Sequence, residues 1–351
     1  MSDVNREWIL ARRPQGAADV SDFEYRESPV PDSAHLPDGH LLVRTGVFLH
    51  APTMRNWMDA PGNNYYPSVD LDSPMLATCA GEVVASADER FPVGTRVTTI
   101  GFWQDYATVN AQIMPVRAVA DHRSLIDDMG PVGMNALTAY MGMIEVGQPK
   151  EGETVVVSGA AGSTGSVAGQ IGKILGCRVI GIAGSASKCD YLTEELGFDA
   201  AIDYRAENVE DRIRELAPDG VDVFFDNVGG PILQAAVENI AKFGRIVLCG
   251  QISGYDGSAP ISGPSNMMRL IYGSVRMQGF LLGDYEDSIP AAREQLWTWV
   301  QEGRISHRED IRDGFENLPG SFGDLSRGAN DGTLLVVTDP ELAQRRLAGG
   351  A

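Results

Sequence analysis

The fold is decided by the stretch Val155-Val156-Val157-Ser158-Gly159-Ala160-Ala161-Gly162-Ser163-Thr164-Gly165. Its apolar start predicts a buried strand, and the amphipathic pattern that follows predicts a helix. Small residues at Gly159, Ala160 and Gly162 let the backbone approach a pyrophosphate, and Gly165 permits close packing of helix on strand. The amides and positive dipole of the helix N-terminus suit such an anion. The stretch therefore predicts a dinucleotide-binding turn; the alternative is a tight turn that binds nothing.

Downstream of this turn, apolar strands alternate with amphipathic helices. The predicted strands are Val155–Ser158, Arg178–Ala183, Ala200–Tyr204, Val221–Asn227, Arg245–Gly250 and Met277–Leu282. Helical patterns begin near Thr164, Ser187, Asn208 and Pro231, and another covers about Asp287 to Gln301. Such alternation predicts βαβ units, so the expected fold class is α/β with a doubly wound parallel Rossmann sheet. Six strands in this order also argue against the alternative that the turn binds nothing.

A second, β-rich domain is expected at the two ends of the chain. From Leu41 to about Val116, short β-rich runs alternate with Gly and Pro turns, which is typical of a barrel-like lobe. The strand pattern at 332–337 is expected to rejoin this lobe. We therefore expect a β-rich catalytic domain at 1–128 and 306–351, and a Rossmann domain at 129–305.

Composition excludes several classes of protein. Apolar residues make up 43% of the chain, and the net charge of −20 is spread along it, which indicates a solubilising surface and argues against nucleic acid as a partner. The charged residues of 1–13 leave no apolar core for a signal peptide, and no run approaches about 20 apolar residues. We expect a cytoplasmic protein without membrane association. None of the four cysteines belongs to a Cys-x-x-Cys pair.

The end of the second predicted strand indicates which nicotinamide cofactor binds. NAD enzymes place an acid there for the ribose 2′-hydroxyl, but the segment Ile182–Lys188 contains none. Lys188 can pair with a 2′-phosphate and the Ser185 hydroxyl can donate to it, which favours NADPH. Such a charge-assisted contact is worth on the order of 1.5 to 3 kcal/mol. The alternative makes Lys188 a solvated residue at a helix start.

Two common catalytic arrangements are missing from the sequence. A catalytic zinc site needs converging Cys, His and carboxylate ligands, but the β-rich lobe offers Cys79, His50 and scattered acids. His50, in the run Val47–His50, is interpreted as packed or hydrogen-bonded rather than as a ligand. The Tyr-x-x-x-Lys pair of short-chain reductases does not occur. Without a metal to polarise a ketone, hydride addition to a double bond conjugated with a carbonyl is the easier reaction.

Ordered motifs along the chain resemble one family. They include 5–8 (Asn-Arg-Glu-Trp), 137–140 (Leu-Thr-Ala-Tyr), 176–185, 225–230 (Phe-Asp-Asn-Val-Gly-Gly), 314–319 and 328–330. The chain resembles the zinc-free medium-chain reductases, the group of leukotriene B4 12-hydroxydehydrogenase/prostaglandin reductase and bacterial curcumin reductase. This resemblance implies a GroES-like catalytic domain, NADP as cofactor, a small enone or alkenal substrate, and a homodimer.

The resemblance also implies site residues. Those beside the cofactor, together with the turn, would be Met134, Thr138, Gly162, Ser163, Thr164, Gly165, Gly184, Ser185, Lys188, Tyr204, Asn227, Cys249, Gly250, Ile252, Tyr255, Phe280, Leu281, Leu282 and Asn330. Tyr255 would be catalytic, donating a hydrogen bond directly or through the ribose as the enolate forms. The alternative is a loop aromatic that covers the cofactor without chemistry.

One departure concerns the substrate end. The family usually has Asp-Pro-Tyr-Met-Arg at the front of the cleft, whereas this chain has Ala51-Pro52-Thr53-Met54-Arg55. Met54, Tyr65 and Tyr66 are the expected substrate residues, and either tyrosine could supply the hydroxyl that Thr53 lacks or be a surface aromatic. The sequence predicts an NADPH-dependent enone or alkenal reductase; the alternatives are a quinone reductase of the same fold and an inactive NADPH-binding protein.

Overall fold

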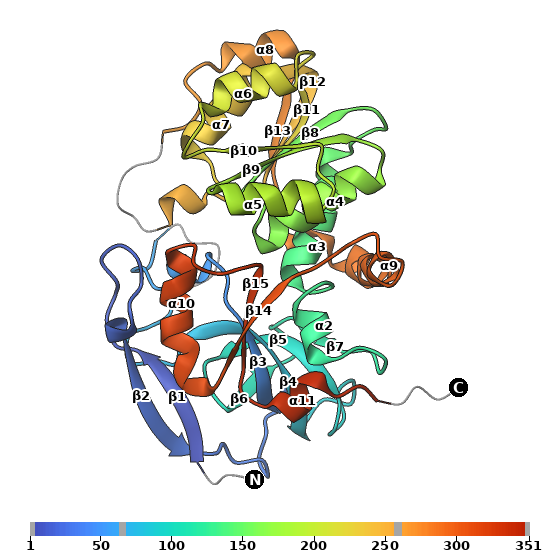
Figure 1. Cartoon of the computed structure of the whole chain (residues 1–351). Coiled ribbons are helices and arrows are strands. Elements are labelled where there is room, and N and C mark those ends of the chain that lie inside the picture. The colour runs from blue at the N-terminus through green and yellow to red at the C-terminus, as the bar shows by residue number, and fades with distance from the viewer. Residues whose placement is uncertain (1–3, 63–67, 256–261, 348–351) are drawn as a thin grey trace. The chain divides into compact units, whose positions relative to one another are not determined.

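The computed structural model describes residues 4–62, 68–255 and 262–347. Contacts divide the chain into two compact units, coloured along the chain in Figure 1. The β-rich unit comprises Met1–Gly130 and Glu309–Ala351, and the Rossmann unit comprises Pro131–Arg308. No helix within the described ranges is long and apolar enough to cross a membrane.

The Rossmann unit contains a six-stranded sheet in the order β10-β9-β8-β11-β12-β13, with every neighbouring pair parallel. Its strands are β8 (Thr154–Ser158), β9 (Arg178–Ala183), β10 (Ala200–Asp203), β11 (Val221–Asp226), β12 (Ile240–Leu248) and β13 (Arg276–Gly279). Starting from β8, the chain adds β9 and β10 on one side of the sheet and β11, β12 and β13 on the other, as in doubly wound dinucleotide folds. The predicted fold class is confirmed.

Helices cover both faces of this sheet, as Figure 1 shows. They are α3 (Met134–Met141), α4 (Ser163–Ile174), α5 (Ala186–Asp190), α6 (Val209–Leu216), α7 (Gly230–Glu238), α8 (Met268–Gly273) and α9 (Ile289–Gln301). Shorter turns are the π-helical η2 (Gly142–Gly147) and η3 (Tyr191–Glu195), and the 3₁₀ segments η4 (Ile252–Gly254) and η5 (Leu282–Ser288). One core packs α3, α4 and α9 on the sheet; the other packs α6 and α7 on the opposite face.

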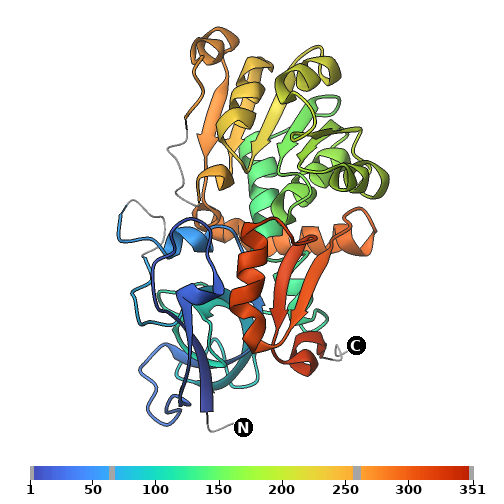
Figure 2. The same ribbon diagram turned by 60° about the vertical axis from the view of Figure 1, so that its left-hand side comes forward.

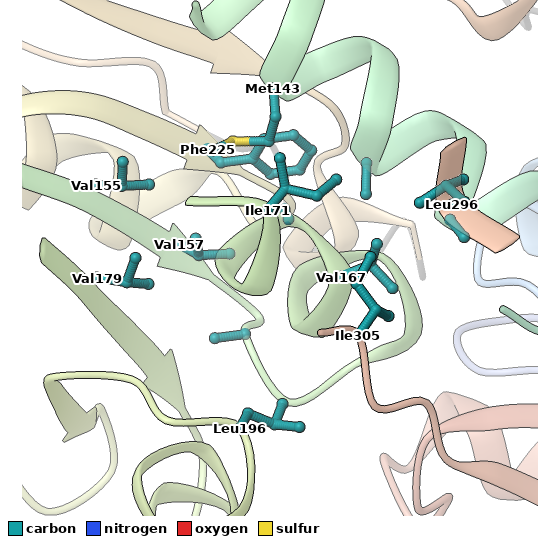
Figure 3. Packing of buried hydrophobic residues seen from close by; sticks show 14 of the residues in the cluster. Met143, Val155, Val157, Val167, Ile171, Val179, Leu196, Phe225, Leu296 and Ile305 are labelled. Carbon is teal, nitrogen blue, oxygen red and sulfur yellow. The ribbon is translucent and has the colours of Figure 1, made fainter. Parts of the chain in front are cut away.

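Figure 3 shows part of the first core, where α4 packs on the sheet. Val157 of β8 and Phe225 of β11 are fully buried together with Val167 and Ile171 of α4. Burying apolar side chains stabilises the fold by about 25 cal/mol for each Å² of apolar surface removed from water. This contact therefore holds α4 in place on the sheet. The turn before α4 is thereby held at the carboxyl end of β8.

The β-rich unit is built mainly from antiparallel strands. A seven-stranded sheet has the order β14-β15-β3-β4-β5-β7, with β6 also paired to β3, and β1 and β2 form a separate hairpin. The bounds are β1 (Val4–Leu10), β2 (Phe23–Pro29), β3 (His40–Leu49), β4 (Leu76–Ser86), β5 (Arg96–Phe102), β6 (Tyr106–Asn110), β7 (Val116–Ala118), β14 (Glu309–Asp313) and β15 (Thr333–Val337). Its helical segments are η1 (Val20–Asp22), α1 (Met54–Trp57), α2 (Leu125–Met129), η6 (Phe315–Asn317), α10 (Leu318–Ser326) and α11 (Pro340–Gln344).

The predicted return of the C-terminal strand to this lobe is confirmed. β15 pairs antiparallel with β3, with Val336 opposite Phe48. In Figure 2 the red C-terminal strands and the blue N-terminal strands belong to the same unit. A segment more than 280 residues from β3 therefore completes its sheet.

The structure corrects the ends of two predicted strands. β12 begins at Ile240 rather than Arg245, and its early part contains Phe243 at a φ of +65° and pairs irregularly with β11. β13 ends at Gly279 rather than Leu282. The first residues of β12 were missed because Phe243 and Gly244 interrupt its strand pattern and its pairing with β11 is irregular. After Gly279, Phe280 and Leu282 contact the core without continuing the strand.

Candidate functional site

The turn between β8 and α4 has the geometry expected of an anion seat. Gly159 adopts a φ of +58°, and the Gly162 N–H donates to Gly159 O at 3.0 Å. A Cβ on Gly165 would press against Gly159 O and lie 2.9 Å from the Cα of Ala160, so only glycine fits there. No side chain caps the N-terminus of α4. The positive end of the α4 helix dipole therefore lies at this turn, where it suits an anion.

A second helix braces this turn. Asn135 of α3 donates from Nδ2 to the Ser163 hydroxyl at 2.9 Å. Met134 and Thr138, both predicted to lie beside the cofactor, are on the same helix and half-buried, and the Thr138 hydroxyl donates to Met134 O. Sequence reasoning missed Asn135 because its partner is 28 residues away and nothing local marks the contact.

The residues predicted for the 2′-phosphate gather at the carboxyl ends of β9 and β10. Ser185 caps α5 and accepts a hydrogen bond from the Lys188 N–H at 3.3 Å. Tyr204 lies on Gly184, where a Cβ would come within 2.8 Å of its ring. Arg205, which the sequence reading did not single out, has its guanidinium 5.7 Å from the centre of the Tyr204 ring. Two basic residues, Lys188 and Arg205, thus belong to the segments that follow β9 and β10.

Across the sheet, Asn227 and the loop after β12 lie together. Asn227 follows β11, and its Nδ2 donates to Ser158 O at 2.7 Å. The Ile252 N–H donates to Asn227 O at 3.1 Å, which holds η4 against the end of β11. A Cβ on Gly250 would lie 3.2 Å from both Asn227 O and the Tyr255 hydroxyl. The structure therefore places Gly250, Ile252 and Tyr255 of this loop close to Asn227 and to one another.

Tyr255 itself is half-buried, and its hydroxyl accepts a hydrogen bond from the Gln251 N–H at 3.3 Å. Burial raises the pKa of this tyrosine above its ordinary value, so the hydroxyl is protonated at neutral pH. Its own proton is left to donate to a ligand. Burial likewise raises the pKa of the nearby Cys249 thiol to about 12, which excludes a thiolate there.

The three residues after β13 face different surroundings. Phe280 is half-buried, and a Cβ on Gly142 would lie 2.8 Å from its ring. Leu282 also packs on the core of the Rossmann unit, whereas Leu281 is 41% exposed. Leu281 is therefore the member of this predicted group with the most surface to offer a ligand.

Met54 and Asn330 are predicted site residues that belong to the β-rich unit. Met54 of α1 is 1% exposed within a core that includes Trp57. Asn330 lies between α10 and β15, and its Nδ2 donates to Gly332 O at 2.8 Å. Tyr65 and Tyr66 lie outside the described residues.

His50 is a core residue of the β-rich unit. Its Nε2 donates to Leu318 O at 3.0 Å, and its ring packs 5.4 Å from Trp103 and 5.6 Å from Phe322, measured between ring centres. Burial lowers its pKa to about 3, so the ring is neutral. Burial raises the pKa of Cys79 to about 12. In the part of the chain that the structure describes, no three His, Cys, Asp or Glu side chains are grouped so that they could hold a metal ion.

Two family models match this chain. Residues 6–116 match "N-terminal domain of oxidoreductase", and residues 163–301, within the Rossmann unit, match "Zinc-binding dehydrogenase". The chain is 37% identical to the NADPH-dependent curcumin reductase of Escherichia coli, covering 95% of this chain and 96% of that protein. It is 35% identical to prostaglandin reductase 1 of Oryctolagus cuniculus, covering 93% and 91%.

A solved structure is similar over the same length. CurA from Vibrio vulnificus in complex with NADPH superposes with a TM-score of 0.87 at 35% identity, covering 95% of this chain and 99% of that one. The resemblance inferred from sequence motifs is confirmed by these relatives.

Proposed function

The chain belongs to the reductase family that includes curcumin reductase and prostaglandin reductase 1, and we propose that it reduces the carbon–carbon double bond of α,β-unsaturated ketones or aldehydes. It is an oxidoreductase that uses NADPH. The observation that carries the proposal is the protonated Tyr255 hydroxyl, which lies over Gly250 at the carboxyl end of the Rossmann sheet.

The residues present fit NADPH. Gly165 leaves room for the chain to turn tightly before α4, and the uncapped helix N-terminus suits a pyrophosphate. Ser185, Lys188 and Tyr204 surround the position proposed for the 2′-phosphate, with Arg205 beside them. Asn227 would bind the nicotinamide half from the end of β11.

When bound, NADPH supplies a hydride to the β-carbon of the substrate. Negative charge then develops on the substrate's carbonyl oxygen, which becomes that of an enolate. We assign Tyr255 the hydrogen bond to this oxygen, directly or through the ribose, because its hydroxyl accepts from Gln251 and keeps a proton to donate. Tyr255 or solvent then protonates the α-carbon of the substrate.

We also propose that the reaction needs no zinc. The two side chains of the β-rich unit best suited to zinc are both neutral, since the pKa of His50 is lowered to about 3 and that of Cys79 raised to about 12. A thiol must lose its proton to bind zinc tightly, and His50 already donates from Nε2 to a backbone carbonyl. Activity should survive prolonged treatment with a chelator.

A homodimer is the proposed assembly. β13 is an edge strand of the six-stranded sheet, and such strands readily pair with another chain. The adjacent α8 leaves the neighbouring side chains of Ile271 and Tyr272 66% and 78% exposed, and contiguous exposed apolar surface often marks an interface. Both features support a second copy of the chain as the partner of this edge.

The substrate class is tested by offering purified protein NADPH with an enone, an alkenal or a quinone. We expect loss of NADPH absorbance with the enone or alkenal, and a saturated ketone or aldehyde as product. An allylic alcohol, or turnover of the quinone alone, would contradict double-bond reduction. Tight NADPH binding without turnover of any acceptor would support an inactive binding protein.

A further inference from the structure

Asp226 is a buried carboxylate that the mechanism above does not use. It ends β11 and is 0% exposed, and no basic side chain of the described ranges forms an ion pair with it. Its Oδ1 accepts hydrogen bonds from the Ser158 hydroxyl at 2.8 Å, the Val228 N–H at 3.0 Å and the Gly229 N–H at 3.0 Å. Burial raises the pKa of Asp226, whereas the hydrogen bonds from Gly229, Val228 and Ser158 act against this rise and so favour the carboxylate form.

Ser158 connects this carboxylate to Asn227. The Ser158 hydroxyl donates to Asp226 and accepts from the Asn227 N–H, both at 2.8 Å, while Ser158 O accepts from Asn227 Nδ2 at 2.7 Å. The Asn227 side chain is thereby oriented through its nitrogen. Its Oδ1 receives no hydrogen bond from the described residues, and remains an acceptor for a ligand hydroxyl.

The backbone of Asp226 holds the other side of the site. Its carbonyl oxygen accepts from the Cys249 N–H at 2.9 Å and the Gly250 N–H at 3.0 Å. Gly250 lies beside the Tyr255 hydroxyl. One residue therefore links the turn at Gly229, the end of β8 and the loop that carries Tyr255.

We propose that the Ser158 and Asp226 side chains form a buried hydrogen-bond relay that positions Asn227, and through Asn227 the 249–255 loop, to bind the nicotinamide half of NADPH. Both are positioning residues, since neither side chain has surface to touch the cofactor. The inference rests on the proposed placement of Asn227 and Tyr255 beside the cofactor. Binding of NADPH is its direct readout, so it is tested without any enone turnover.

The same pair of strands offers a matched control. Four residues earlier on β11, Asp222 accepts a hydrogen bond from the Thr154 N–H at the start of β8 at 2.8 Å. Asp222 and Asp226 thus join the same two strands at opposite ends. Only the carboxyl ends of parallel strands face a ligand in this fold.

The experiment compares Asp226→Asn, Ser158→Ala and Asp222→Asn for melting temperature, NADPH dissociation constant and KM for the enone. Asparagine keeps the shape of Asp226. It presents either an NH₂ group, which cannot accept, or a neutral and therefore weaker acceptor to the three donors of Ser158, Val228 and Gly229. We expect Asp226→Asn and Ser158→Ala each to weaken NADPH binding by about tenfold, the size of one lost buried hydrogen bond. Asp222→Asn should lower the melting temperature while leaving NADPH binding within about twofold, and KM for the enone should not change in any of the three.

Combining the two relay variants distinguishes a relay from two separate contacts. The double variant should weaken NADPH binding by less than the product of the single effects, because the first change already breaks the chain of bonds. The inference is overturned if Asp226→Asn and Ser158→Ala lower only the melting temperature, or if Asp222→Asn weakens NADPH binding equally. Should Asp226→Asn fail to fold, an unchanged dissociation constant in Ser158→Ala would still overturn it.

Discussion

The hydroxyl of Tyr255 accepts a hydrogen bond from the backbone N–H of Gln251 at 3.3 Å, so the proton of that hydroxyl is free to be donated. Replacing Tyr255 by phenylalanine keeps the ring and removes the donor. We expect kcat for an enone to fall by about a hundredfold, as for loss of one donor to a developing oxyanion, with little change in NADPH affinity.

Steady-state kinetics with NADPH and enone varied in turn measure this effect. Tyr140→Phe is the control, because Tyr140 is also half-buried in the Rossmann unit but packs on Trp299 of α9. An unchanged kcat in Tyr255→Phe would leave Tyr255 as an aromatic cover without a chemical role.

Lys188 should set the preference for NADPH over NADH. In Lys188→Ala we expect the KM for NADPH to rise by roughly tenfold to 150-fold and that for NADH to stay nearly constant, because only NADPH carries the 2′-phosphate. Lys173→Ala is the control, since Lys173 is paired with Asp199 at 2.7 Å near the far end of α4. Equal changes for both cofactors would place the phosphate elsewhere, and Arg205→Ala would then be the next variant to measure.

Gly165 is required by the turn before α4. An alanine there would put its Cβ against Gly159 O and 2.9 Å from the Cα of Ala160, both backbone atoms that cannot rotate away. We expect Gly165→Ala to abolish detectable NADPH binding or to prevent folding. Gly320→Ala, within α10 where a Cβ meets no atom within 4 Å, should be neutral or slightly stabilising. Wild-type NADPH affinity in Gly165→Ala would contradict the proposed pyrophosphate seat.

The sequence predicted the Rossmann unit well because its central strands are buried on both faces and appear as continuous apolar runs. It missed β14 for the opposite physical reason. This strand lies at a sheet edge, and its residues Glu309–Asp313 are mostly charged, because one side of an edge strand faces solvent. The short α8 was also missed, since six residues give too few turns for a periodic pattern.

The candidate site was predicted where a motif is local and missed where a contact is distant. The turn before α4 and the segment around Lys188 contain their own signals. Ser158 and Asp226 are 68 residues apart, so the hydrogen bond between them appears only when β8 and β11 lie side by side. The same holds for Asn135 and Ser163, which belong to two helices.

His50 makes stability depend on pH. Its folded pKa of about 3 is below the ordinary value of 6.5, so the unfolded chain binds a proton that the folded chain excludes. This contribution to the free energy of unfolding is complete above pH 6.5 and is lost as the pH falls toward 3, at up to about 1.4 kcal/mol per pH unit.

Chemical denaturation at several pH values tests this prediction. His50→Gln, which keeps a donor for Leu318 O, should show a shallower loss of stability below pH 6.5 than the wild type. The surface substitution His35→Gln is the control, because His35 is exposed beside Asp32. A slope that His50→Gln does not change would mean that other groups cause the acid sensitivity.

The exposed apolar side chains of α8 predict where the chain dimerises. Placing a charge at Tyr272, which is 78% exposed beside the edge strand β13, should oppose burial of this surface against a second copy. We expect Tyr272→Glu to shift the protein from dimer to monomer in light scattering coupled to gel filtration. Ile113→Glu alters an equally exposed apolar residue, 77% exposed, in the β-rich unit and should leave the dimer intact. A monomeric wild type, or a dimer that resists Tyr272→Glu and dissociates with Ile113→Glu, would exclude the β13 edge as the interface.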